Sequence, residues 1–501
     1  MHDTKDKLPE GAGAQPARRV RSLAALGEAT TDLLIIGGGI VGAGIARDAA
    51  LRGLRVGLVE RSDFASGTSS RSSRLLHGGL RYLAQGRVGL VREASVEKTL
   101  LRRIAPHLVQ PLGFIFPTYR GTDWPLWQLR IGVRVYDLLC SGHNFESSST
   151  LSRTETLRRL PALEPNRLNG AVRYFDGLTH DARLVMDTLR AAAAAGAILL
   201  NYCEFVHAKR DGACWSCDVE DHLTGAQLHL TTRVLINATG PWGNRFPQSR
   251  VRLRLTKGIH CVLHRQRLPV PEAVVITEGR RILFIIPWGD RVIVGTTDTD
   301  YDGPPEAVRT EASDVAYVLQ SVNRFFPGLA IGEADVLSSW AGLRPLLAKA
   351  NGTPSDISRS HQIRLSQPGW LDVAGGKLTT YRLMAEQVVD RVLLELGRPR
   401  IPCSTAELPL LPPGTSVEFS GVQPPPLSEA AVRHFCTEEW AVHLEDVMLR
   451  RAGWEYGLAN PASVARQVGA WMADALGWPP AVLADELEQY ESAADHSLAA
   501  R

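Results

Sequence analysis

The sequence predicts an α/β fold that begins with a βαβ unit, and three observations lead to this prediction. The apolar run Asp32–Ile36 has the length and composition of a buried strand, and glycines follow it directly. Residues 41–52 have the pattern of a helix, and residues 55–59 that of a second buried strand. A strand, a glycine-rich turn, a helix and a strand in this order are typical of a parallel sheet.

The turn between the first strand and the helix has the spacing G-x-G-x-x-G, formed by Gly37, Gly39 and Gly42. The first glycine permits a tight turn, the second lets a pyrophosphate approach the backbone, and the third lets helix and strand pack closely. The N–H groups and dipole of the helix N-terminus favour the same anion. Glu60 ends the second strand, at the spacing of a carboxylate that binds ribose hydroxyls. These features together predict a Rossmann-like dinucleotide-binding domain.

The rest of the chain mixes helical and strand patterns without an internal repeat. Further helices are expected at 88–104, 124–139 and 181–195, and further strands at 234–238, 283–286, 292–294 and 371–373. Prolines crowd residues 409–426, which indicates a linker, and a helical pattern follows it. The expected organisation is a disordered tail at 1–30, a dinucleotide-binding domain at 31–400 with a substrate domain inserted at about 245–340, a Pro-rich linker at 401–427 and a C-terminal helical domain at 428–501.

The composition excludes several classes of protein. Of the 501 residues 44% are hydrophobic and 22% charged, close to a globular average, which excludes a disordered, collagen-like or coiled-coil chain. The 56 basic and 53 acidic residues give a formal net charge of +3, which argues against a nucleic-acid binder.

Cysteines and apolar segments indicate the compartment. No uncharged apolar stretch is long enough to span a bilayer, and the N-terminus lacks the apolar segment of a signal peptide. Among seven scattered cysteines, Cys214 and Cys217 form the one C-x-x-C pair, which we interpret as incidental, so no metal is expected. An odd number of cysteines without an export signal fits a reducing, intracellular compartment.

Two later segments suit FAD, whose flavin extends far beyond the pyrophosphate. Val234–Gly240 is a strand that ends in small residues, where the backbone can approach a cofactor closely. Gly375–Thr380 follows a strand and precedes a helix, so its N–H groups can face the flavin carbonyls. Glycine-rich strand ends are common in α/β folds, so each segment alone is only moderately specific.

The segment Thr68–Leu83, TSSRSSRLLHGGLRYL, closely resembles the FAD-dependent, quinone-linked aerobic glycerol-3-phosphate dehydrogenases of the D-amino-acid-oxidase-like flavoprotein group. Further matches are NATGPW at 237–242, PW at 287–288, GTTD at 295–298, GLRP at 342–345 and GGKLTTYR at 375–382. The matches run in family order from about residue 31 to 400. The region from 428 resembles the family's helical domain more loosely, and the N-terminal tail has no counterpart.

The resemblance implies a Rossmann-like FAD-binding domain with an inserted mixed-sheet substrate domain and a C-terminal helical domain. It also implies a set of cofactor-binding residues: Gly37, Gly39, Ile40, Val41, Gly42, Glu60, Arg61, Thr68, Ser69, Ser73, Leu75, His77, Gly78, Gly79, Val206, Ala238, Thr239, Gly240, Gly376, Leu378 and Thr379.

The implied substrate is sn-glycerol 3-phosphate, whose phosphate calls for convergent cations. The candidates for substrate binding are Arg81, Tyr82, Arg344, Arg359 and Lys377. Arg344 lies in a largely apolar stretch, and without the resemblance a partly buried structural ion pair would be the better interpretation.

Oxidation of the secondary alcohol requires a base, and histidine is the natural base near neutral pH. Two histidines fall in matching motifs, His77 and His260, and the sequence leaves open which one takes the proton. Lys377 could polarise the alcohol or the flavin, and Arg344 completes the catalytic set. Residues 296–298 could line the pocket, although a tight turn would explain them equally well.

Membrane contact is expected because the implied acceptor, a quinone, is dissolved in the bilayer. Trp124, Trp127, Ile131, Val135 and Leu138 form one stripe of a helix, with Arg120, Arg130 and Arg134 beside it. Two interpretations stay open: packing on the core, or contact with a membrane interface. The expected location is the cytoplasm, peripherally attached to the inner face of the cell membrane, and a homodimer stays open.

Three other interpretations of the sequence stay open. A glycerol-3-phosphate oxidase would pass electrons to O2 and release peroxide. An FAD-dependent amine oxidase of the same fold would not need the Arg- and Lys-rich pocket. A non-catalytic FAD-binding subunit would lack a complete substrate set, whereas Arg81, His260, Arg344 and Lys377 are all present.

Overall fold

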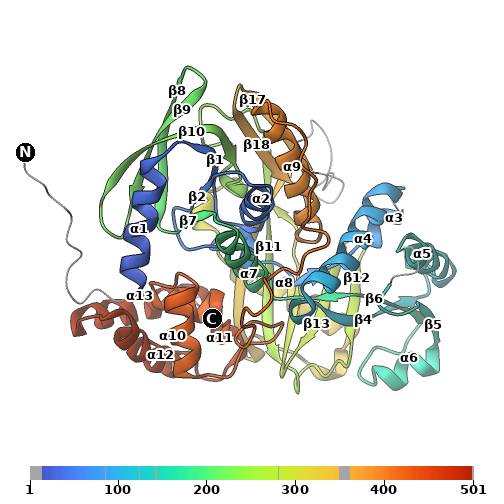
Figure 1. The fold of residues 1–501 in the computed structure, drawn as a ribbon. Coiled ribbons are helices and arrows are strands. Elements are labelled where there is room, and N and C mark those ends of the chain that lie inside the picture. Colours follow the sequence, from blue (N-terminus) through green and yellow to red (C-terminus); the bar gives the residue numbers. More distant parts are fainter. Residues whose placement is uncertain are drawn as a thin grey trace, which may run out of the picture.

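Two sheets and a set of C-terminal helices make up the computed structural model, which describes residues 14–84, 86–122, 124–140, 144–279, 281–348 and 361–498 (Figure 1). The first sheet holds the predicted βαβ unit. Its strand order is β17 (His361–Gln367), β18 (Trp370–Gly375), β10 (Gln227–Asn237), β1 (Thr31–Ile36), β2 (Val56–Val59) and β7 (Ile198–Leu200). Strands β18, β10, β1, β2 and β7 run parallel, and the hairpin of β8 (Cys203–Asp211) and β9 (Cys214–Asp221) extends β10.

Apolar strands buried on both faces explain this sheet. Leu33, Leu34 and Ile35 of β1 are fully buried, as expected for a central parallel strand. Helix α2 (Ile40–Leu51) packs between α7 (Asp181–Ala194) and α9 (Tyr381–Glu395) on one face. The carboxyl ends of β1, β2, β10 and β18 therefore meet at one edge, where ligands of open α/β sheets bind.

Residues 14–28 correct the expectation of a disordered tail. They form helix α1 (Ala14–Glu28), which buries Leu23 and Leu26 against the other face of the first sheet. The guanidinium of Arg19 bonds Asp221 and the carbonyl oxygen of Asn201. The polar and basic composition of this segment obscures the helical spacing of these two apolar side chains, which lie one turn apart. Residues 1–13 lie outside the described range.

The second sheet carries the substrate side. Its strand order is β15 (Thr299–Asp300), β11 (Leu253–His264), β14 (Arg291–Gly295), β13 (Arg281–Trp288), β12 (Ala273–Glu278), β4 (Gln110–Tyr119), β6 (Leu168–Leu178) and β3 (Leu75–Leu76). Strand β16 (Val336–Leu347) pairs with β11, and β5 (Ser149–Ser152) pairs with β6. Helix α8 (Ala312–Phe325) packs against β11 and β12.

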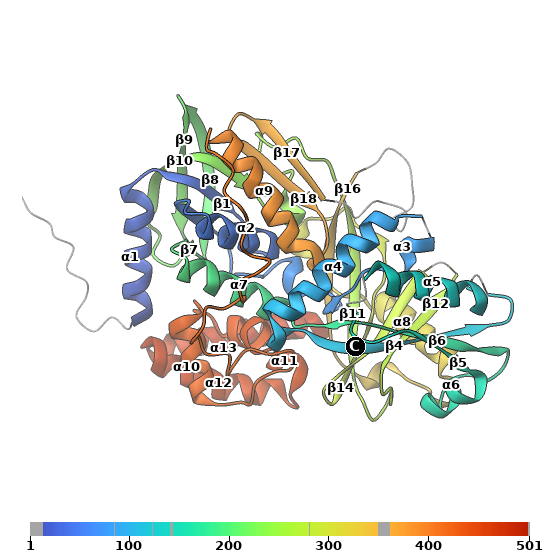
Figure 2. The ribbon, with the colours of Figure 1, turned by 45° about the vertical axis from the view of Figure 1, so that its right-hand side comes forward.

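The substrate domain is therefore not a single insertion at about 245–340. Strand β4 pairs with β12 through Phe114 and Ala273, so residues 75–178 contribute four of the ten strands of the same sheet. Helices α3 (Arg81–Ala84), α4 (Val88–Ile104) and α5 (Leu126–Leu139) lie together on one side of the molecule (Figures 1 and 2). Helix α6 (Arg153–Arg159) packs on β6. A pairing between strands so far apart in the chain leaves no local signal.

The C-terminal helices gather beneath the dinucleotide-binding half (Figure 1). They are α10 (Glu429–Glu438), a π-helical turn at Asp446–Arg451, α11 (Trp454–Gly457), α12 (Pro461–Leu476) and α13 (Pro480–Leu498). They share a core of their own, and buried ion pairs attach it to the rest. Arg450 and Arg451 both bond Asp63, which lies in the loop after β2.

Candidate functional site

Two adjoining cavities lie at the carboxyl edge of the first sheet. One, of about 980 Å³, runs along the glycine turn and Glu60. The other, of about 830 Å³, lies between that edge and the second sheet. The residues that line both cavities include Thr68, Ser69, Arg71, Gly376, Lys377 and Leu378. The two cavities therefore form one long channel, large enough for a dinucleotide and a small substrate at its end.

The first cavity has the geometry that a dinucleotide requires. Gly37 has φ of +110°, and a Cβ there would lie 2.7 Å from the carbonyl oxygen of Ala238, so the turn accepts only glycine. The side chain of Glu60 accepts hydrogen bonds from the N–H groups of Gly38 (2.8 Å) and Ser62 (3.0 Å). Burial raises the pKa of Glu60, and those two N–H donors oppose the shift. Backbone and a carboxylate thus line the path of a pyrophosphate and a ribose, and the residues present fit FAD.

Most predicted cofactor residues line this channel. Those on the first cavity are Gly37, Gly39, Ile40, Val41, Glu60, Arg61, Thr68, Ser69, Val206, Ala238, Thr239, Gly240, Gly376 and Leu378. Those on the second are Ser73, Leu75, His77, Gly79 and Thr379. Gly42 and Gly78 are absent from both linings. Gly42 instead packs on the backbone of Gly37, and Gly78 donates its N–H to Tyr136 Oη at 2.8 Å.

Arg344 lies on β16 in the wall of the second cavity. Its guanidinium donates to Thr296 Oγ1 (2.8 Å) and to the carbonyl oxygen of Thr297 (3.2 Å), and it lies 3.3 Å from Asp298 Oδ1. It rests on Gly258 of β11, where a Cβ would lie 2.4 Å from Nη2. Arg344 therefore forms an ion pair and also lines the cavity, so both interpretations made from the sequence apply to it.

His260 lies on β11 beside Arg344 and is 2% exposed. Its Nε2 lies 2.7 Å from Ser73 Oγ, and its ring stacks on Trp340 with centroids 5.1 Å apart. Burial, the guanidinium of Arg344 and that of Arg74 lower the pKa of His260 to about 3. The imidazole is therefore neutral at physiological pH, the protonation state that a general base needs.

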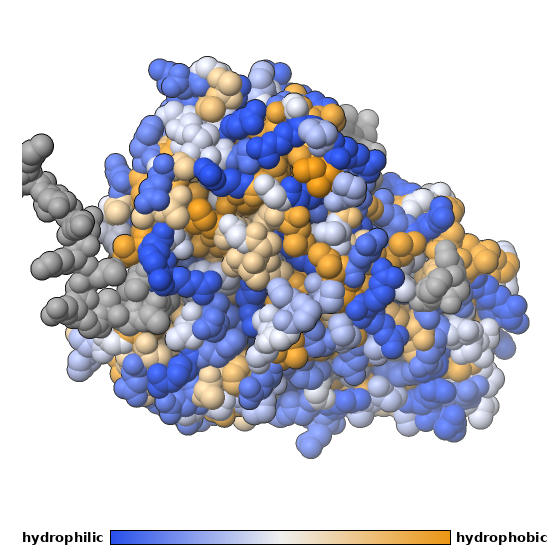
Figure 3. All heavy atoms as spheres, in the orientation of Figure 1, coloured by the Kyte–Doolittle hydropathy of each residue, from blue (hydrophilic) through white to orange (hydrophobic). Residues whose placement is uncertain are grey.

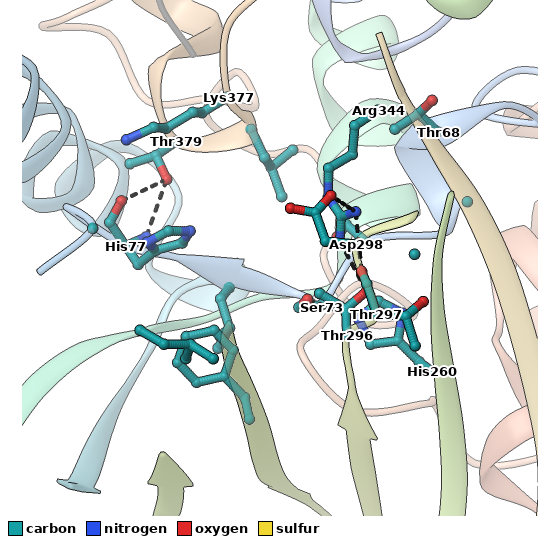
Figure 4. Close-up of a pocket in the computed structure, with 18 of the residues that line it drawn as sticks. Thr68, Ser73, His77, His260, Thr296, Thr297, Asp298, Arg344, Lys377 and Thr379 are labelled. Carbon is teal, nitrogen blue, oxygen red and sulfur yellow. Dashed lines mark hydrogen bonds and ion pairs between the residues drawn. The ribbon is translucent and has the colours of Figure 1, made fainter. Parts of the chain in front are cut away.

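Lys377 and His77 come from the other side of the cavity (Figure 4). Lys377 Nζ lies 4.1 Å from the ring centroid of Tyr82, which is 2% exposed. The loop with His77 is tied to Thr379 by the His77 N–H (3.1 Å to Oγ1), and Thr379 Oγ1 in turn donates to the His77 carbonyl. In Figure 4 the two groups face each other, His77, Lys377 and Thr379 opposite Arg344, Asp298 and His260.

For two of the predicted substrate residues the structure does not describe the side chain. Arg359 lies outside the described residues, and of Arg81 the structure describes the backbone, at the start of α3. Sequence reasoning missed Arg71, which lines both cavities, and Arg74, whose charge acts on His260. Both lie within the segment 68–83 on which the resemblance rests, so their position in that segment could have identified them as site residues.

The fold and the channel define a dinucleotide-dependent enzyme with titratable and cationic side chains at the end of the cofactor path. The family model for FAD dependent oxidoreductases (DAO) matches residues 32–383, more than half of the chain. The chain belongs to this family of FAD dependent oxidoreductases, which confirms the predicted cofactor and the Rossmann-like α/β fold.

Similar proteins have more specific names. The aerobic glycerol-3-phosphate dehydrogenase of Bacillus subtilis (strain 168) is 40% identical over 405 residues, 78% of this chain and 73% of the relative. That of Staphylococcus aureus (strain MRSA252) is 38% identical over 390 residues, 75% of this chain and 70% of the relative. The X-ray structure of the glycerol-3-phosphate dehydrogenase from Bacillus halodurans complexed with FAD has a TM-score of 0.79 at 27% identity. It covers 97% of this chain and 98% of its own.

Proposed function

We propose that this chain oxidises sn-glycerol 3-phosphate to dihydroxyacetone phosphate. The observation that carries the proposal is the convergence of Arg344, Lys377, His77 and His260 on one cavity at the end of the cofactor channel. Bound FAD supplies a two-electron acceptor for the hydride of the secondary carbon. The names of relatives up to 40% identical support the same substrate.

The phosphate dianion requires cations with fixed donors. Arg344 is oriented by Thr296 and Thr297, which leaves its planar fork held rigidly at the cavity wall. Lys377 adds a second cation, kept above the ring of Tyr82. Asp298 lies beside Arg344 and repels a dianion, so the phosphate is expected on the side of the guanidinium away from Asp298.

The hydroxyl proton requires a neutral base. His260 fits this role by its position, because it lines the cavity beside Arg344, and it is neutral because burial and two guanidinium groups lower its pKa. As the carbon–hydrogen bond gives up its hydride, the oxygen–hydrogen bond gives its proton to the imidazole, and a ketone remains. His77, half-buried in the facing loop, is the alternative base.

We further propose that a membrane quinone takes the electrons and that α5 touches the membrane. Among the described residues, no helix combines the length and apolar character that crossing a bilayer requires. On α5, Trp127, Ile131 and Leu138 are 65%, 57% and 77% exposed, with Val135 beside them at 38%. Apolar side chains gather at the edge of the molecule where α5 lies (Figure 3). Arg130 and Arg134 are exposed next to this apolar stripe, a combination that suits anionic lipid.

The segment just before α5 connects the stripe with the site. Trp124 is half-buried, packs on Phe116 at a centroid distance of 5.7 Å and lines the second cavity. It therefore packs on the core, unlike the four residues that follow it in the stripe. The cavity wall around it is aromatic, with Phe114, Phe284 and Tyr174, a surface that suits a quinone ring.

The experiment is anaerobic reduction of the purified holoenzyme. Addition of glycerol 3-phosphate should bleach the flavin absorbance, and glycerol without phosphate should not. Bleaching by amino acids instead would contradict the proposal and favour an amine oxidase. Reoxidation by a soluble quinone, without matching peroxide from O2, would distinguish a dehydrogenase from an oxidase.

A further inference from the structure

Two contacts hold the imidazole of His260, and both lead to Arg74. Ser73 Oγ bonds Nε2, and the indole of Trp340 covers one face of the ring. Ser73 is the chain neighbour of Arg74, and the guanidinium of Arg74 lies 5.3 Å from the ring centroid of Trp340. A side chain outside the cavity lining is thus connected to both supports of the candidate base.

The guanidinium of Arg74 lies in a box of three aromatic rings. Its Cζ is 4.2 Å from the ring centroid of Trp288 and 5.6 Å from that of Tyr456, in addition to Trp340. Arg74 is 1% exposed, and within the described part of the chain its Nε and Nη1 have no hydrogen-bond partner. Aromatic faces therefore replace the usual acceptors of a buried arginine.

The backbone at Arg74 shows the same constraint. Arg74 has φ of +56°, a region that non-glycine residues rarely adopt and that persists where the surroundings enforce it. Its N–H bonds Ser72 Oγ at 3.0 Å, and its carbonyl accepts from Thr179 at 2.9 Å. This conformation places Ser73 toward His260 and Arg74 toward the ring box.

One wall of the box comes from the C-terminal helices. Tyr456 lies on α11 and packs on Trp340 at a centroid distance of 4.9 Å. Trp288 is held from the linker, because its Nε1 donates to the carbonyl of Val422 at 3.0 Å. The C-terminal part of the chain is thus in contact with the group that supports the candidate base.

We propose that Arg74, boxed by Trp288, Trp340 and Tyr456, is a positioning residue that fixes Ser73 and Trp340 and thereby orients His260. The inference rests on the proposed role of His260 as the base. The charged and titratable groups around this unit are Arg344 on β16, His180 at the N-cap of α7, Asp181 in the first turn of α7, and Tyr456 on α11.

The test is anaerobic flavin reduction between pH 5 and 9 in the variants Arg74→Gln and Tyr456→Ala. Loss of orientation should lower the limiting rate of Arg74→Gln roughly 10- to 100-fold. Loss of the nearby cation should raise the pKa of His260 from about 3, so an acidic limb that the parent does not show between pH 5 and 9 should begin to appear at the acidic end of that range. Tyr456→Ala should slow reduction severalfold, whereas Tyr456→Phe, which keeps the ring, should reduce flavin like the parent.

Three controls separate positioning from general damage. Arg74→Lys keeps the charge and should restore most of the rate and the parental pH profile. Met472→Ala removes a buried side chain from the C-terminal core and should lower the melting temperature without moving the pH profile. FAD content is measured in every variant. If Arg74→Gln yields no folded holoenzyme, Tyr456→Ala and Tyr456→Phe decide the question.

The outcomes distinguish a failure of the positioning role of Arg74 from a failure of the proposed base, His260. If His260→Ala loses its rate while Arg74→Gln and Tyr456→Ala keep the parental rate and pH profile, the positioning role is overturned and the proposed base remains. If His260→Ala reduces flavin at the parental rate, the proposed base is wrong and Arg74 has nothing to position.

Discussion

The cofactor wall and the substrate wall of this site are built in different ways. The cofactor wall uses backbone and small side chains at strand ends of one parallel sheet, as at Gly37 and Ala238. The substrate wall uses long charged or titratable side chains, and each needs partners from distant segments. Ser73 and His260, for example, are separated by 187 positions. A cofactor wall of this kind depends on local chain geometry, whereas the substrate wall depends on packing between the two sheets.

The largest effect should come from closing the cofactor wall with Gly39→Val. A Cβ at Gly39 already lies 3.1 Å from Ser69 Oγ, so a branched side chain must also extend into the channel that Gly39 lines. We expect purified protein with almost no flavin and correspondingly no activity. Flavin absorbance per protein is the measurement, and Gly328→Ala, at an exposed open position, is the control. A full complement of FAD in Gly39→Val would show that this wall tolerates side chains.

The next largest effect tests the substrate wall through His260→Ala. Loss of a general base should slow anaerobic flavin reduction roughly 100- to 10,000-fold, with FAD content unchanged. Because the pKa of His260 is about 3, the base stays unprotonated as the pH falls from 9 to 5. The parent should therefore show no acidic limb from this group in that range.

His77→Ala is the matched comparison for that experiment. His77 lies on the facing loop, is half-buried and should cost less if His260 is the base. A large loss in His77→Ala together with a near-parental rate in His260→Ala would reverse the assignment. Near-parental rates in both would transfer the role to Lys377 or to water.

A smaller effect is expected for Arg344→Lys, which keeps the charge but loses the planar fork. Thr296 and Thr297 hold two donors of that fork, and an ammonium group cannot reproduce both bonds and the phosphate contact. A lost charge-assisted contact costs about 1.5–3 kcal/mol, or roughly 10- to 100-fold in kcat/KM. Steady-state kinetics with a dye acceptor measure it, and an unchanged kcat/KM would remove Arg344 from phosphate binding.

The difference between the walls also explains what the sequence could predict. Gly37, Gly39, Glu60 and Gly376 all line the channel as expected, because a strand, a turn and a helix carry that geometry within a few residues. The strands from residues 75–178 in the second sheet were missed, because a pairing such as Phe114 with Ala273 leaves no local pattern.

Long-range packing hid the remaining parts of the site. His260 and Arg344 could be predicted because each lies in a sequence motif. The contact between the rings of Tyr456 and Trp340 could not be predicted, because no motif includes it. Helix α1 was missed because only Leu23 and Leu26 of its length are buried among the residues whose side chains the structure describes. In both cases the signal is a contact that exists only after folding.

The smallest expected effect concerns the outer side of the substrate wall, at α5. Leu129, Val133 and Tyr136 of this helix are buried, whereas Trp127 and Leu138 are exposed, so the two faces can be changed separately. We expect the double variant Trp127→Ser, Leu138→Ser to bind anionic vesicles on the order of 10- to 100-fold more weakly, since two apolar side chains lose their burial in lipid. Leu394→Ser, 69% exposed on α9, is the control and should bind like the parent.

Dye-linked activity should persist, and reduction of a long-chain quinone should fall with vesicle binding. If vesicle binding is unchanged, the membrane surface lies elsewhere on the protein. If dye-linked activity collapses as well, these side chains support the substrate wall from outside, and its dependence on packing extends to the surface of the molecule.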